Sequence, residues 1–338
     1  MDFRTHVQIP EVSFKIDHSA KMMMFGSCFS ENIGSKLQQS KFNVDVNPFG
    51  ILYNPMSVSS SLRRLLRKTE FTESDLVYNN EMYHSFMHHG SFSDTDKDIC
   101  LKKISERYNK AADFIENADM FLITFGSAYV YRLKPAVYKD KYEIVGNCHK
   151  FPPEMFERTR LSVEEIVEEW RSLIMLLKAV NPDVKFVFTV SPIRHWRDGA
   201  HENQISKSIL HLAIDRLISF FGDDLQYFPA YEIMIDELRD YRFYEDDMNH
   251  PTSFAVDYIW KLFSKAFFSD ATISINKEWS QIRKSINHKP LFPATNSYRN
   301  FLKQTVRSLN DFALKYPFIS CENEIDQISF ILKSQDRD

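Results

Sequence analysis

The sequence has very little glycine, few cysteines and no surplus of basic residues. Glycine accounts for 8 of 338 residues, against a usual level of about 7%, so each glycine is expected where the backbone requires one. The four cysteines form no C-x-x-C pair, which argues against a zinc ribbon, a thioredoxin-like motif and a disulfide framework. The 42 basic and 46 acidic residues leave a net charge of −4, which argues against nucleic acid as a partner.

Long apolar runs are also missing. No run approaches the roughly 18 residues that a membrane span needs, and the apolar run at 22–25 is only long enough for a strand. The first 20 residues carry charges throughout, in place of the continuous apolar segment of a secretory signal. We therefore expect a cytoplasmic protein with free thiols and no membrane association. The sequence leaves the oligomeric state open.

The chain does contain short apolar segments that alternate with longer amphipathic ones. This alternation predicts an α/β fold with a mostly parallel sheet covered on both faces and a ligand site at the carboxyl ends of the strands. Pro251 is expected to open the last helix of this part as its first residue, with a length of about 17 residues. The expected strands are 21–25, 42–46, 119–126, 184–190 and 225–228, and the expected helices are 29–37, 55–67, 98–117, 162–180, 201–220 and 251–267.

Two stretches interrupt this alternation and are interpreted as insertions, at about 82–97 and 134–160. In the first, His84, His88 and His89 include the i, i+4 spacing of metal ligands on a helix, but no carboxylate pattern accompanies them and a solvated loop is the preferred interpretation. We expect residues 1–270 to form one α/β domain. Residues 271–338 are expected to form a helical extension packed on its core.

Two short motifs carry groups suited to nucleophilic catalysis. Gly26-Ser27-Cys28 places a hydroxyl and a thiol at the turn between the first strand and its helix, where the helix dipole lowers a thiolate pKa. Asp247-Met-Asn-His250 places a carboxylate where it can orient an imidazole. The alternatives are structural: Cys28 as a packing residue with Ser27 as a helix cap, and the Asp247 motif as another cap.

The residues around these motifs resemble the GSCFA family. Phe-Gly-Ser-Cys-Phe-Ser-Glu-Asn-Ile-Gly at 25–34 matches the motif that names the family, with Ser30 in place of its alanine. The family is similar to the SGNH (GDSL-like) hydrolases, which are flavodoxin-like three-layer proteins that hydrolyse or transfer acyl groups, often acetyl groups on carbohydrates. The likeness continues in order through 47–55, 124–128, 147–150, 191–195 and 247–251.

The resemblance implies roles for individual residues. By register with the first SGNH block the nucleophile is Cys28, and Ser27 falls on the aspartate position and is the alternative nucleophile. The glycine of the second block, which lends an N–H to the oxyanion hole, corresponds to Gly50. The last block, D-x-x-H, matches Asp247 and His250 fully.

The third block departs from the superfamily pattern. Its asparagine, a side-chain donor to the oxyanion, corresponds to Ala128, and Ser127 or Asn54 would have to substitute for it. Superfamily members often bind substrate from the loop after the fourth strand, which makes Arg194 and His195 candidate substrate-binding residues. A packing role for His195 is the equal alternative.

Together these expectations describe an ester hydrolase or O-acyltransferase acting on an acylated substrate, for example an acetylated saccharide, through a nucleophile–His–Asp triad. Such chemistry needs no metal and no redox cofactor. The alternative is a degenerate module that has lost catalysis and binds a glycan or an acyl compound in the same cleft. The missing asparagine at Ala128 is the feature that favours this alternative.

Overall fold

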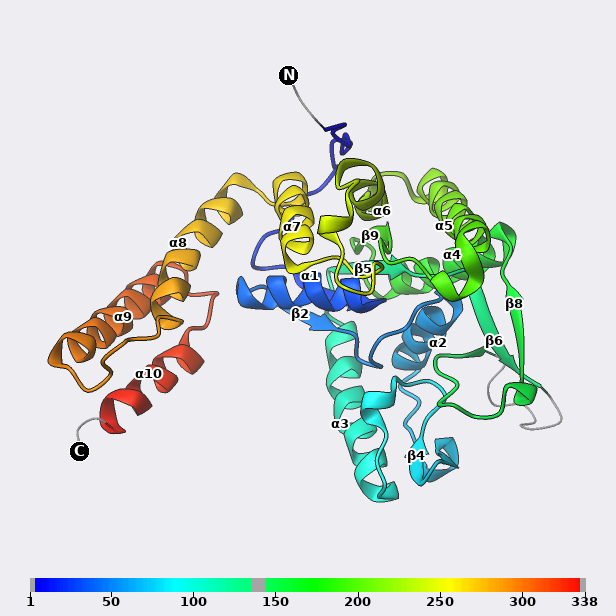
Figure 1. Ribbon diagram of the computed structural model, residues 1–338, viewed down its shortest axis with the longest axis horizontal. Helices are drawn as coiled ribbons and strands as arrows, with labels where there is room; N and C mark the ends of the chain where they lie inside the picture. Colours follow the sequence, from blue (N-terminus) through cyan, green and yellow to red (C-terminus); the bar gives the residue numbers. More distant parts are fainter. Residues whose placement is uncertain (1–3, 135–143, 335–338) are drawn as a thin grey trace.

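A parallel sheet of five strands forms the centre of the computed structural model, which describes residues 4–134 and 144–334 (Figure 1). The strand order is β10-β9-β5-β1-β2, and every neighbouring pair is parallel. The chain leaves β1 toward β2 on one side and returns to β5 on the other, so the order reverses between β1 and β5. Ligands of open α/β sheets bind at such a reversal. The strands are β1 (Lys21–Phe25), β2 (Asn43–Val46), β5 (Met120–Phe125), β9 (Lys185–Val190) and β10 (Leu225–Tyr227).

Helices cover both faces of the sheet, because the central strands carry apolar side chains on both of their faces. Met23 and Phe25 of β1 belong to one buried apolar cluster, and Met22 and Met24 belong to the other. The α/β class expected from the sequence is therefore confirmed, and the strand order is that of flavodoxin-like folds. The first cluster packs under α2 (Pro55–Leu66), α3 (Lys97–Ile115), α4 (Val163–Val180) and α5 (Gly199–Phe221), and the second under α1 (Cys28–Gln39) and α7 (Ser253–Phe267).

The prediction that Pro251 opens the last of these helices is wrong. Thr252 caps α7, its hydroxyl accepting a hydrogen bond from the Ala255 N–H at 3.3 Å. Pro251 lies before the cap, where it forms a bridge with Tyr244. The threonine hydroxyl satisfies a free N–H of the first turn, which a proline cannot do, so the helix begins at Ser253 and has 15 residues.

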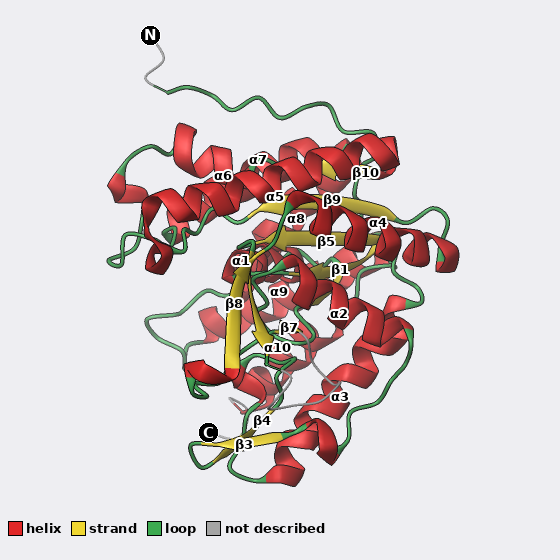
Figure 2. Cartoon of the chain, turned by 90° about the vertical axis from the view of Figure 1, so that its right-hand side faces the viewer, coloured by secondary structure: helices red, strands yellow, loops and turns green. Residues whose placement is uncertain are grey.

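Both interruptions of the alternation carry strands of their own. The first contains β4 (Met82–His84), which pairs with β3 (Val77–Asn79), and the short 3-10 turn Gly90–Phe92. The second overlaps an antiparallel sheet of β6 (Tyr129–Leu133), β7 (Ile144–Val145) and β8 (Phe156–Arg160). Residues 135–143 of that predicted insertion lie outside the described residues. Figure 2 shows β8 running at a steep angle to β5 and β9.

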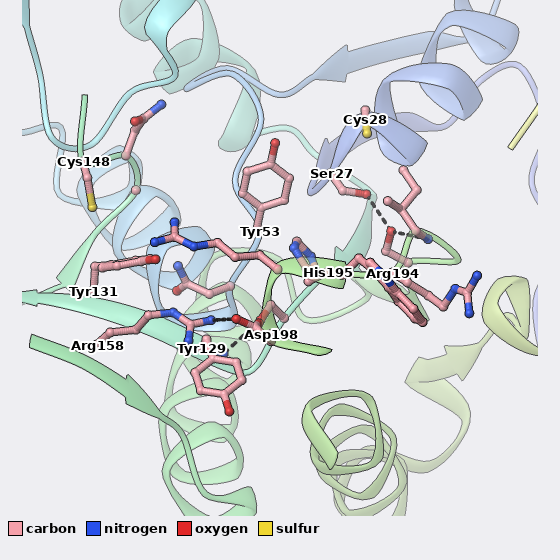
Figure 3. A pocket seen from close by; sticks show the side chains of 18 of the residues that line it. Ser27, Cys28, Tyr53, Tyr129, Tyr131, Cys148, Arg158, Arg194, His195 and Asp198 are labelled. Atoms are coloured by element: carbon pink, nitrogen blue, oxygen red, sulfur yellow. Dashed lines mark hydrogen bonds and ion pairs between the residues drawn. The ribbon is translucent and has the colours of Figure 1, made fainter. Parts of the chain in front are cut away.

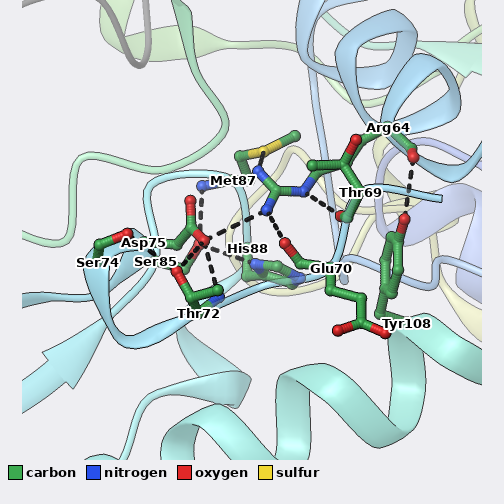
Figure 4. A network of polar contacts seen from close by, with 10 residues as sticks. All are labelled: Arg64, Thr69, Glu70, Thr72, Ser74, Asp75, Ser85, Met87, His88 and Tyr108. Atoms are coloured by element: carbon green, nitrogen blue, oxygen red, sulfur yellow. Dashed lines mark hydrogen bonds and ion pairs between the residues drawn. The ribbon is translucent and has the colours of Figure 1, made fainter. Parts of the chain in front are cut away.

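The solvated loop expected around His84 and His88 is wrong, because both side chains are buried. His88 is 1% exposed, its ring stacks on Phe49 at 4.8 Å, and its Nδ1 lies 2.9 Å from the Ser85 hydroxyl. Burial lowers the pKa of His88 to about 3, so the ring is neutral. It lies beside a network in which Arg64 contacts Asp75 and the Glu70 carbonyl (Figure 4).

The C-terminal helices α8 (Asp270–Ile286), α9 (Asn296–Lys315) and α10 (Glu322–Ser334) have their own apolar cluster, which includes Trp279, Leu309 and Phe312. Trp279 also donates a hydrogen bond to the Gln39 carbonyl at the end of α1 at 2.7 Å. Figure 1 shows α9 and α10 on the opposite side of the molecule from β6 and β8. Within the described residues, no helix has the length and apolar character that crossing a membrane requires.

Candidate active site

A cavity of about 750 Å³ opens at the carboxyl ends of β1, β5 and β9, next to the reversal of strand order (Figure 3). Its volume falls within the range of ligand pockets, about 300–1,000 Å³. Three parts of the chain that are distant in sequence meet there: the turns after the strands, the loop before α7, and the β6–β7–β8 sheet. The lining includes Ser27, Cys28, Tyr53, Asn54, Ser127, Tyr129, Tyr131, Cys148, Lys150, Arg158, Ser191, Arg194, His195, Trp196, Arg197, Asp198, Asp247 and His250.

Ser27 and Cys28 differ in how accessible they are. Ser27 is 2% exposed and caps α1, its hydroxyl accepting from the Phe29 N–H at 3.3 Å and donating to the Ser191 hydroxyl at 3.1 Å. Cys28 is the first residue of the helix and is only half-buried. The turn therefore commits its hydroxyl to the fold and leaves its thiol at the cavity.

Burial raises the pKa of the Cys28 thiol, an effect larger than the opposing one of the backbone N–H groups of Cys28 and Phe29. The negative charges of Glu31 and Asp247 act in the same direction as burial. The helix dipole is expected to lower the pKa of this thiol. Burial outweighs that effect, because removing water destabilises the thiolate by more than one helix end stabilises it. Cys28 is a neutral thiol in the unliganded protein.

Asp247 holds His250 in a defined orientation. The carboxylate contacts Nδ1 of the ring, and its other oxygen accepts the backbone N–H groups of Asn249 and His250, each at 2.9 Å. These bonds, that from the His250 N–H above all, lower the pKa of Asp247 to about 2, so it is ionised at neutral pH. A carboxylate at Nδ1 fixes the proton there and leaves the Nε2 lone pair available.

Cys28 and His250 line the same cavity, but in the described part of the chain no hydrogen bond joins them. The side chains of Asp247 and His250 are each 49% exposed, so their loop forms an open wall of the cavity. Catalytic hydrogen bonds in unliganded proteins are often long and tighten only when substrate binds.

The expected oxyanion donors lie in different settings. Gly50 does not line the cavity: its N–H donates to the Asn47 carbonyl at 2.8 Å, and an added Cβ would lie 2.4 Å from Cβ of His89. Asn54 lines the cavity but caps α2, bonding the N–H and the hydroxyl of Ser57. The Ser127 hydroxyl lines the cavity, accepts from the Tyr129 N–H at 3.1 Å and lies 3.4 Å from the Ser206 hydroxyl. Because a hydroxyl hydrogen can rotate between partners, Ser127 is a more adaptable donor than the Asn54 amide.

His195 and Arg194 both lie at the cavity, as the resemblance implied. The backbone N–H of His195 donates to the Asn203 side chain at 2.9 Å, and its ring meets Tyr53 edge-on at 5.5 Å. Burial, followed by the charge of Lys207, lowers the pKa of His195 to about 4, so this ring is neutral at pH 7. Arg194 lies over the Trp196 ring, 4.9 Å from its centroid.

Lys207 lies beneath the cavity and was not found by sequence reasoning. It is 0% exposed and donates to the Gly126 carbonyl at 2.8 Å and the Ser191 carbonyl at 2.7 Å, thereby joining the ends of β5 and β9. Burial lowers its pKa to about 7. Its position on the buried stripe of α5 was the available signal. That stripe contains Asn203, Lys207, Leu210, Ile214 and Leu217.

We call the buried polar residues Ser27, Ser127, Ser191 and Lys207 the floor of the cavity, and the exposed residues Trp196, Arg197, Asp247 and His250 its rim. The aromatic and basic side chains of β6 and β8 were also missed, because no motif marks them. Arg158 of β8 contacts Asp198 at 2.5 Å and lies 3.9 Å from the centroid of the Tyr129 ring. Among residues 4–134 and 144–334, no three His, Cys, Asp or Glu side chains are grouped to hold a metal ion.

Comparison with known proteins places the chain in a family. The model of the GSCFA family matches residues 21–263, and that of the C-terminal domain of GSCFA domain proteins matches residues 279–333. No curated protein sequence matches the chain. A solved carbohydrate esterase family 3 protein from Talaromyces cellulolyticus is 11% identical over 77% of this chain and 99% of its own, with a TM-score of 0.34. That likeness is too low to carry an argument about function. Since the first family model covers most of the 338 residues, the chain belongs to the GSCFA family.

Proposed function

We propose that this protein is an ester hydrolase or O-acyltransferase in which Cys28 is the nucleophile, His250 the general base and Asp247 the residue that orients it. One observation carries the proposal. Cys28 from the start of α1 and the Asp247–His250 pair from the loop before α7, more than 200 residues later, line the same cavity at the switch point of the sheet.

The first step forms a thioester. Nε2 of His250 takes the proton from the Cys28 thiol as the sulfur attacks the carbonyl carbon of the bound ester. The tetrahedral intermediate collapses, the carbon–oxygen bond to the alcohol breaks, and the imidazolium returns the proton to the leaving oxygen. In the second step His250 takes a proton from water or an acceptor hydroxyl, whose oxygen attacks the thioester carbon. The carbon–sulfur bond then breaks, and the imidazolium returns the proton to the sulfur of Cys28.

The raised thiol pKa supports a mechanism in which deprotonation accompanies attack. A preformed thiolate–imidazolium pair needs a lowered thiol pKa, whereas burial raises that of Cys28. The open position of the Asp247–His250 loop fits the same sequence of events, because a bound substrate can draw His250 toward the thiol.

The N–H of Cys28, at the free amino end of α1, and the Ser127 hydroxyl are the oxyanion donors that we propose. Gly50 is not among them, because its N–H is bonded to Asn47. Tyr53, Tyr129, Tyr131 and Trp196 give the cavity flat apolar faces between polar groups, which suits an acylated saccharide.

The experiment that tests the proposal is brief exposure to p-nitrophenyl acetate, followed by peptide mass spectrometry and a rate assay. We expect an acetyl group on Cys28 in the wild type, no label at residue 28 and no turnover in Cys28→Ala, and little label in His250→Ala. Cys148→Ala is the matched control, because Cys148 is a half-buried thiol of the same cavity that has no carboxylate–histidine pair assigned to it. It should keep full activity.

An acetyl group on Ser27 would show that Ser27 is the nucleophile in place of Cys28, and the proposed enzyme class would stand. A degenerate binding module is the second candidate, favoured by Ala128 at the expected asparagine position and by the absence of a described Cys28–His250 hydrogen bond. If the protein binds acylated saccharides but shows neither label nor turnover, it is a binding module and the proposed enzyme activity is wrong.

A further inference from the structure

The charged side chains around the cavity are unbalanced in sign. The whole chain carries a net charge of −4, yet among the described residues the cavity is lined by four basic side chains and two carboxylates. This local excess is opposite in sign to the charge of the protein. The basic residues are Lys150, Arg158, Arg194 and Arg197, and the acidic ones are Asp198 and Asp247.

Both carboxylates already have partners. Asp198 accepts from Arg158 at 2.5 Å, and Asp247 contacts Nδ1 of His250. Across residues 4–134 and 144–334, no carboxylate forms an ion pair with Lys150, Arg194 or Arg197. Three cations on one concave surface therefore have no carboxylate partner, and the four basic side chains exceed the two carboxylates by two charges. Low-dielectric walls strengthen the combined field of these cations.

Arg194 is the most informative of the three. Its Nε is buried and has no hydrogen-bond partner among the described residues. The guanidinium lies 4.9 Å from the centroid of the Trp196 ring and 5.8 Å from that of Tyr244, and these contacts orient it without accepting its hydrogen bonds. A buried donor without an acceptor is costly. The two terminal nitrogens of the guanidinium are not buried in this way and form no hydrogen bond within the described residues, so they are the atoms that can donate to a ligand oxygen. Figure 3 shows Arg194 next to His195 at the cavity.

We propose that the substrate of this site carries an anionic group, a carboxylate or a phosphate, in addition to its acyl ester, and that Arg194 and Arg197 bind that group. Guanidinium groups bind both anions through paired hydrogen bonds. The ester part of this inference rests on the proposed function, whereas the anionic group is inferred from the basic side chains alone. Burial is the main cause of the lowered pKa of His195, and the nearby charges of Lys207 and Arg158 lower it further, which agrees with a positive potential in the cavity.

The test compares three sugars built on the same hexose ring: glucose, glucuronate and glucose 6-phosphate. Calorimetric titration of the full chain at low salt should give at least about tenfold tighter binding for one or both anionic sugars than for glucose, as expected for hydrogen bonds to a charged group. The preference should decrease as salt is added. Whichever anionic sugar binds more tightly identifies the carboxylate or the phosphate as the natural group.

The double variant Arg194→Gln, Arg197→Gln should lose this preference. Arg160→Gln is the control, because Arg160 lies on β8, pairs with Glu202 at 2.6 Å and does not line the cavity. Equal binding of all three sugars, no binding of either anionic sugar, or a preference that survives in the double variant overturns the inference. Anionic sugars that bind to a protein with no esterase activity would refute the proposed function and leave this inference standing.

Discussion

The floor and the rim of the cavity are built in different ways. Floor residues are almost fully buried, and their polar atoms are joined to each other or to the strand ends, as in the Ser27–Ser191 and Lys207–Ser191 bonds. On the rim, Asp247 and His250 are half exposed and bond mainly within their own loop. The difference separates two requirements: the floor stabilises the meeting of the strands, and the rim supplies groups that can move toward a ligand.

If this division is right, floor substitutions should change the stability of the protein and rim substitutions should change its chemistry alone. Four variants test the division, and their expected effects decrease in the order given.

Gly26→Ala, in the turn that forms the floor, should have the largest effect. Gly26 has φ +147, and an added Cβ would lie 2.5 Å from the Thr124 carbonyl oxygen. We expect a loss of about 4 kcal/mol or more in the free energy of unfolding, from clash and strain together. Gly199→Ala is the control, since Gly199 has φ +80 but no described atom lies within 4 Å of its added Cβ. If urea unfolding shows the same loss of unfolding free energy in both variants, the close contact between residue 26 and the Thr124 carbonyl is not the cause.

His250→Ala, on the rim, should lower kcat/KM for an activated ester by about 10²–10⁴-fold while leaving the melting temperature unchanged. Its ring is half exposed and bonds only to Asp247 among the described residues, so its removal leaves no buried gap. His201→Ala, which removes an exposed histidine of α5, should match the wild type in both measurements. A large drop in melting temperature would show that the rim is structural.

Lys207→Met should change how stability depends on pH. The folded-state pKa of Lys207 is about 7 against an ordinary 10.5, so between these values the unfolded chain holds a proton that the folded chain lacks. The free energy of unfolding of the wild type should therefore rise with pH relative to the variant, by roughly 2–3 kcal/mol from pH 7 to pH 9.

Lys261→Met, which removes an exposed lysine of α7, serves as the comparison for this pH series. Its free energy of unfolding should follow that of the wild type at every pH. If Lys207→Met follows it as well, the buried ammonium is not the group that responds.

Ser27→Ala should have the smallest effect, a loss of about 1 kcal/mol in the free energy of unfolding with most of the esterase activity retained. The change removes the cap of α1 and the bond to Ser191. Ser162→Ala, which removes the cap of α4 and does not line the cavity, should cost a similar amount. Abolished turnover in Ser27→Ala alone would move the nucleophile from the thiol to the hydroxyl.

Much of the fold could be predicted because its signals are local. The β5 strand is a six-residue run with every side chain buried, and α4 begins at a capping box of Ser162 and Glu165, so each element is defined by its own residues. The two halves of the candidate site were also visible, since each follows or precedes an element with a clear boundary.

The remaining features depend on contacts between distant residues. Lys207 bonds a carbonyl 81 positions earlier in the chain, and a lone lysine in a helix does not indicate which carbonyl it will meet. Gly50 matched its motif, but the turn commits its N–H to Asn47. Motifs specify residue types, whereas the availability of an N–H or a lone pair is decided by packing.

The packing of α1 and α7 in one apolar cluster also bears on how the protein is synthesised. A ribosome adding about 5–20 residues per second produces Cys28 roughly 10–40 s before His250, which lies 222 positions later. In the proposed mechanism the thiol has no base during that interval, because Cys28 meets His250 only after α7 has packed beside α1. A growing chain that has not yet reached Phe267, the last residue of α7, therefore lacks the proposed triad, so the proposed acyl transfer would begin only after α7 has been synthesised and has folded.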